Sequence, residues 1–89
     1  MKKMNLIRKT NELVNNYDPM DLLSLGAPDN EYSDESLKVA VAYSNSKTIN
    51  DFKKKFVLIF ANSFGLKSSS GKYLDLEKIA GAIYSELNG

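Results

Sequence analysis

The feature that most constrains the fold is the spacing of apolar residues between positions 49 and 64. Phenylalanine recurs at positions 52, 56 and 60, and the predicted face comprises Ile49, Phe52, Phe56, Ile59, Phe60 and Ser63, widened by Val57 and Phe64. Apolar residues three and four positions apart lie on one side of an α-helix. Thr48 is a suitable N-cap with Asp51 three residues later, and Gly65 stands where a C-cap glycine belongs. We expect this segment to form the centre of the core.

Two other segments have the same period. The first carries apolar and small residues at Leu6, Ile7, Thr10, Leu13, Val14 and Tyr17. It should end near Tyr17, because Asp18 precedes Pro19 and a residue before proline disfavours the helical region. The second runs from about Leu74 or Asp75, after a loop over residues 66–73. Its predicted buried stripe is Leu76, Ile79, Ala80, Ile83, Tyr84 and Leu87.

The segment from Asp34 to about Ser44 is compatible with either a strand or a helix. Its apolar residues alternate at Leu37, Val39, Val41 and Tyr43, but Leu37, Ala40, Val41 and Ser44 follow helical spacing. Helix is favoured, because a lone strand would leave its backbone polar groups without partners. We expect Ser33 or Asp34 to cap this helix.

A short helical turn is predicted after Pro19, from Met20 to Leu25, ending at Gly26. The complete prediction is therefore an all-α fold, a small bundle of four helices plus this turn. Eighty-nine residues are enough for one core, so residues 1–89 form a single domain.

The composition excludes several classes of function. The chain has no cysteine and no histidine, which removes disulfides, thiolate metal sites and the commonest general base. The net charge of +1 is unlike the strong basic excess of a nucleic-acid-binding domain. No apolar run approaches the roughly 20 residues that span a bilayer, and the start does not read as a signal peptide. We predict a cytoplasmic, non-enzymatic protein without cofactor, metal or membrane contact.

Four motifs that suggest other functions fail on spacing or context. Five residues separate Gly65 from Gly71 where a P-loop has four, and Tyr73 replaces its Ser or Thr. The stretch 29–35 resembles a calcium loop but lacks the glycine at its sixth position. Its carboxylates suit solvent better than the burial that acid–base catalysis needs. Lys53, Lys54 and Lys55 are best read as a solvated helix face.

The most informative functional feature is an acidic stretch over residues 17–36. It contains no lysine or arginine and carries six acidic residues: Asp18, Asp21, Asp29, Glu31, Asp34 and Glu35. Clustered carboxylates create a local negative field that accelerates encounter with a basic partner. The same residues would also serve as helix caps and turns, with Gly26-Ala27-Pro28 as the loop, so both interpretations stay open.

The same stretch resembles a family of small bacterial helical domains of unknown function. Their signature is W-D-P-x-x-L followed by G-A-P-x-D-E-Y-x-x-E, and the matching residues here are Tyr17-Asp18-Pro19 to Leu22, and Gly26-Ala27-Pro28 to Glu35. Tyr17 replaces the tryptophan and Asn30 the aspartate, and the match covers about twenty residues. The resemblance implies a compact all-α fold without established catalysis. It also extends to sequences that accompany bacterial toxin systems as immunity proteins.

Together these observations predict a protein-binding domain, in its sharper form an immunity or antitoxin protein that blocks a basic toxin such as a nuclease. The alternative is a regulatory or scaffold domain with a different protein partner. Leu23, Leu25, Pro28 and Tyr32 would supply apolar anchors, with Tyr17 and Tyr32 half exposed. The predicted partner-binding residues are Asp18, Asp21, Asp29, Glu31, Tyr32, Asp34 and Glu35.

Overall fold

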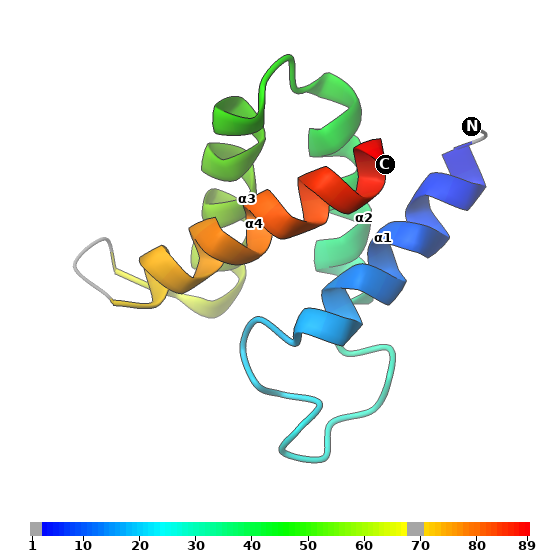
Figure 1. Cartoon of the computed structure of the whole chain (residues 1–89). Helices are drawn as coiled ribbons and strands as arrows, with labels where there is room; N and C mark the ends of the chain where they lie inside the picture. Colours follow the sequence, from blue (N-terminus) through cyan, green and yellow to red (C-terminus); the bar gives the residue numbers. More distant parts are fainter. Residues whose placement is uncertain (1–2, 68–70) are drawn as a thin grey trace.

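The computed structural model describes residues 3–67 and 71–89, and these residues form four helices with no strand. The helices are α1 (Lys3–Tyr17), α2 (Ser33–Asn45), α3 (Ile49–Phe64) and α4 (Lys72–Asn88). Figure 1 shows α2 and α3 side by side, with α4 crossing them and α1 beside α2. Each helix contacts the next along the chain, and α1 also contacts α4, which closes the bundle. The predicted all-α four-helix fold is confirmed.

Most predicted helix ends agree with the structure. α1 ends at Tyr17, before the Asp18-Pro19 pair. The hydroxyl oxygen of Thr48 accepts a hydrogen bond from the Asp51 amide at 3.1 Å, and Gly65 adopts a left-handed φ of 66° after α3. The ambiguous segment is helical, as predicted. α4 begins at Lys72, two to three residues earlier than predicted, and residues 68–70 of the predicted loop lie outside the described part of the chain.

Two predictions about local structure are wrong. Neither Ser33 nor Asp34 caps α2; Ser33 is its first helical residue and no side chain caps this end. The segment after Pro19 forms consecutive hydrogen-bonded turns over residues 22–26 rather than regular helix. Asp21 has a φ of 58°, a left-handed conformation that a right-handed helix cannot include.

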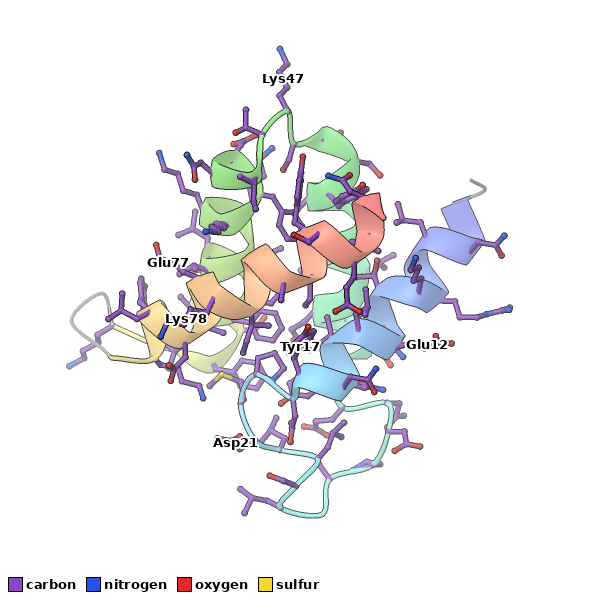
Figure 2. All side chains as sticks on the ribbon, viewed as in Figure 1. Glu12, Tyr17, Asp21, Lys47, Glu77 and Lys78 are labelled. Atoms are coloured by element: carbon purple, nitrogen blue, oxygen red, sulfur yellow. The ribbon has the colours of Figure 1, made fainter. Side chains whose placement is uncertain are left out.

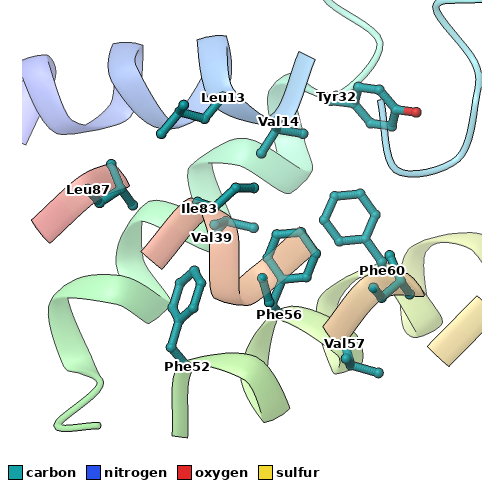
Figure 3. Packing of buried hydrophobic residues seen from close by; sticks show 12 residues of the cluster. Leu13, Val14, Tyr32, Val39, Phe52, Phe56, Val57, Phe60, Ile83 and Leu87 are labelled. Carbon is teal, nitrogen blue, oxygen red and sulfur yellow. The ribbon is translucent and has the colours of Figure 1, made fainter. Parts of the chain in front are cut away.

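The core is built around the aromatic residues of α3 (Figure 3). The rings of Phe56 and Phe60 stack with centroids 4.8 Å apart, and the ring centroid of Phe52 lies 6.0 Å from that of Phe56. The other helices contribute to this cluster Leu13 and Val14 of α1, Val39 of α2, and Leu76, Ala80, Ile83 and Leu87 of α4. Near the ends of α3, Ile49 and Ser63 are exposed, so the predicted stripe is wrong at these two positions, whereas Phe64 packs against the core as predicted.

Gly65 offers a simple test of the end of α3. Because its φ is positive, a side chain there is strained even though no atom of the described residues lies within 4 Å of the position of an added Cβ. We expect Gly65→Ala to lower the free energy of unfolding by about 1 kcal/mol, measured by urea titration. Among the described residues no atom lies within 4 Å of an added Cβ at Gly71 either, but its φ is an ordinary −62°, so Gly71→Ala should cause no comparable loss. Equal losses in both variants would contradict this explanation.

Candidate protein-binding site

The acidic stretch comprises the end of α1, the connection over residues 18–32 and the first turn of α2; the connection lies at the lower end of the molecule in Figure 1. Four of its carboxylate residues are exposed: Asp21, Asp29, Glu31 and Asp34. Glu35 is half-buried on the first turn of α2. The six acidic residues therefore comprise four that face solvent, the half-buried Glu35, and one whose carboxylate is used internally.

Asp18 is the internal one. Its φ of 46° turns the backbone sharply after α1, and its carboxylate faces back into the connection. Oδ1 accepts hydrogen bonds from the Leu23 amide at 3.0 Å and from the Tyr32 hydroxyl at 2.6 Å, and Oδ2 accepts one from the Ser24 amide at 2.9 Å. Desolvation raises the pKa of Asp18, but these hydrogen bonds lower it more, so the net pKa lies below the ordinary value.

Tyr32 completes this arrangement from the other end of the connection. Its hydroxyl also accepts hydrogen bonds from the amides of Met20 at 3.0 Å and Leu22 at 3.4 Å. Its ring is fully buried and packs against Phe60 and Phe64 of α3, with centroids 6.1 and 6.4 Å away. Burial, together with the hydrogen bond to the Asp18 carboxylate, raises the pKa of Tyr32 to about 12. We call these two residues the Asp18–Tyr32 anchor.

The anchor corrects two predicted roles. Tyr32 is not a half-exposed contact residue, because burying its ring in the core leaves none of its surface for a partner. Asp18 does not cap a helix that begins after Pro19; its carboxylate binds amides five and six residues further along the chain. Tyr17, in contrast, is 39% exposed, close to what the sequence predicted. The apolar contact residues predicted from the sequence also differ in exposure, since Leu25 is 81% exposed while Leu23 is half-buried.

Other contacts hold the connection against the helices. Asn15 Nδ2 donates a hydrogen bond to the carbonyl of Asp29 at 3.1 Å. Asp21 Oδ2 lies 3.7 Å from Lys72 Nζ at the start of α4, although 72% of the Asp21 side chain is exposed. The contacts of Asn15 and Lys72 with the connection were not predicted from the sequence, because their partners lie far along the chain and no local pattern indicates them.

The hydroxyl of Tyr17 donates a 2.7 Å hydrogen bond to Glu86 Oε2, which ties the end of α1 to α4. This hydrogen bond raises the pKa of Tyr17 above its ordinary value, with smaller contributions from desolvation and from the Glu86 charge. Figure 2 shows Tyr17 at the junction between α1, α4 and the connection, with Asp21 further out.

The lysines of α3 have separate surroundings. Lys53 lies against Gly81 of α4, where an added Cβ would approach its Cε to 3.0 Å. Lys55 pairs with Asp51 at 3.2 Å, and Lys54 is exposed. These three lysines therefore do not form one continuous basic face.

Within residues 3–67 and 71–89, no three acidic side chains are grouped so that they could hold a metal ion. Of the helices described, none combines the length and apolar character that crossing a bilayer requires. No protein-family model, curated protein or solved structure matches this chain. The resemblance to small bacterial helical domains therefore stays a prediction.

Proposed function

We propose that this protein is a non-enzymatic binding domain that engages a basic protein partner through the connection between α1 and α2. One observation carries the proposal: the exposed carboxylates of Asp21, Asp29 and Glu31 stand on a connection that the Asp18–Tyr32 anchor ties to the core, and exposed Asp34 follows them on the first turn of α2. A binding segment that is already ordered loses less conformational entropy when it meets its partner.

The partner that best fits this chemistry is a toxin domain that binds nucleic acid. Such a domain presents a basic surface to phosphates, and exposed carboxylates compete with phosphates for the same lysines and arginines. Leu25, 81% exposed on the same connection, would supply the apolar contact that electrostatic attraction alone lacks. In this role the protein acts as an immunity or antitoxin protein, and it blocks the active site without performing chemistry.

The experiment is affinity capture from the host lysate, comparing the wild-type protein with the triple variant Asp29→Lys, Glu31→Lys, Asp34→Lys. The reversal removes three attractive charges and adds three repulsive ones, so we expect retention of a basic partner to fall by more than about a hundredfold. Retention by the wild-type protein should weaken as salt rises. Circular dichroism checks that the helix content is unchanged.

A matched control uses exposed acidic residues elsewhere: Glu12→Lys, Asp75→Lys, Glu77→Lys. It makes the same change in net charge and, like the test variant, includes one acidic residue from the first turn of a helix. If the control variant retains the partner and the test variant loses it, the result supports the proposed surface. If the two variants retain the partner equally, the proposed surface is rejected. A captured partner that is lethal when expressed alone and harmless with this protein identifies immunity. A non-toxic partner favours a regulatory or scaffold role instead.

A further inference from the structure

A second surface, distinct from the acidic connection, lies between α2 and α3. It is a shallow groove of about 500 Å³ whose apolar lining comes from Leu37, Val41 and Ala42 of α2 and from Leu58 and Ile59 of α3. The exposed fractions of Leu37, Val41 and Leu58 are 47, 52 and 56%. Isolated apolar residues are ordinary on protein surfaces, but a contiguous apolar groove is typical of an interaction site.

Leu37 and Val41 also form one wall of a neighbouring groove between α1 and α2, opposite Leu6 and Ile7. These two residues, four positions apart on α2, therefore make an apolar ridge with a groove on either side. A ridge of this spacing is what one helix presents to another when side chains interlock. α2 thus has apolar residues on its solvent side as well as towards the core.

The charges that line the α2–α3 groove have one sign. They are Lys38 and Lys55, and among the residues that the structure describes no acidic side chain lines it. Lys55 pairs with Asp51 and donates a hydrogen bond to the Asn45 carbonyl, whereas Lys38 has no hydrogen-bond or ion-pair partner within the described part of the chain. The groove is therefore opposite in charge to the connection between α1 and α2.

We propose that the α2–α3 groove is a docking site for an amphipathic helix of a protein partner, one with an apolar stripe and acidic flanks. The stripe would pack on Leu37, Val41 and Leu58, as a third helix packs against a helix pair. The acidic flanks would pair with Lys38 and Lys55, which fixes the charge of the partner and its orientation. The ridge of Leu37 and Val41, four positions apart on α2, favours a helix over a lipid surface, because helices pack by interlocking side chains of this spacing.

The test uses a labelled peptide of about 15 residues, roughly four helical turns, with leucines at helical spacing and glutamates on both flanks. Binding to the full-length protein is measured by fluorescence anisotropy. We expect Leu58→Asp to weaken binding at least about tenfold and Lys38→Glu by a similar factor, through loss of an apolar contact and reversal of a charge. A peptide with lysines in place of the glutamates should bind the wild-type protein at least about tenfold more weakly.

Matched controls come from α4. Leu74→Asp changes a leucine of similar exposure, 66% exposed, outside both grooves, and Lys78→Glu makes the same charge reversal elsewhere. Both should bind like wild type. The proposal is overturned if the acidic peptide does not bind, if the controls weaken binding as much as the test variants, or if the lysine peptide binds equally well. Binding of anionic lipid vesicles through Leu58 and Lys38, without peptide binding, would also overturn it and assign the surface to membranes.

Discussion

Replacing Phe60 with alanine is expected to lower the free energy of unfolding by about 3–5 kcal/mol, as measured by urea titration. Its fully buried ring stacks on Phe56 and contacts Phe64 and Tyr32, with centroids 4.8, 6.0 and 6.1 Å away. Removing the ring opens a cavity at the point where the core meets the connection between α1 and α2. A domain of this length has a free energy of unfolding of about 4–13 kcal/mol in total, so the substitution would remove a large part of it.

Two further substitutions keep this prediction testable if the alanine variant does not fold. Phe60→Leu removes less volume and should lose about 1–2 kcal/mol, still folded and measurable. Leu58→Ala, two residues away on the exposed side of α3, should change stability by less than about 0.5 kcal/mol. Similar losses at positions 58 and 60 would show that the buried face of α3 is wrongly assigned.

Tyr32→Phe is expected to lower the free energy of unfolding at neutral pH by about 2–3 kcal/mol, although it removes a single oxygen. The Tyr32 hydroxyl donates a hydrogen bond to the Asp18 carboxylate and accepts hydrogen bonds from the amides of Met20 and Leu22. In the phenylalanine variant, the carboxylate and both amides would lose this hydrogen-bond partner. Tyr17→Phe is the matched control. The hydroxyl of Tyr17 makes one exposed hydrogen bond, to Glu86, so its loss should be below about 1 kcal/mol.

The dependence on pH distinguishes the hydrogen bonds of Tyr32 from simple loss of packing. Because the pKa of Tyr32 rises from 10.0 to about 12 on folding, its contribution is complete below pH 10 and is lost as pH rises towards 12. Wild type should therefore lose more stability than Tyr32→Phe over that range. A constant difference between the two proteins from pH 9 to 12 would contradict the assigned role.

At acidic pH the dependence has the opposite direction: stability is lost as the pH falls. The pKa of Asp18 is lowered on folding, so its contribution is present above the ordinary carboxyl pKa of 3.8 and is lost as pH falls through the lower folded value. Since the Tyr32 hydroxyl is one of the groups that lower this pKa, Tyr32→Phe should lose less stability than wild type on acidification. Urea titrations at several pH values measure both ends of the profile.

The acidic connection could be predicted only in part from the sequence. A run of carboxylates without lysine or arginine is visible along the chain, and the exposure of Asp29, Glu31 and Asp34 agrees with it. The burial of Tyr32 could not be predicted, because it depends on the position of Phe60 and Phe64 after α3 packs beneath the connection. The α2–α3 groove was not predicted either, since it exists only where two helix surfaces meet.

By itself, the sequence determined the helices. Local spacing of apolar residues, the proline after Asp18, the Thr48 cap and the Gly65 stop act within one or two turns, so they can be read along the chain. Tertiary structure alone decided which polar groups point inwards. Asp18 and Tyr32 are fourteen residues apart, and their 2.6 Å hydrogen bond requires the core to bring both ends of the connection together. Contacts of that range depend on packing, which no local pattern encodes.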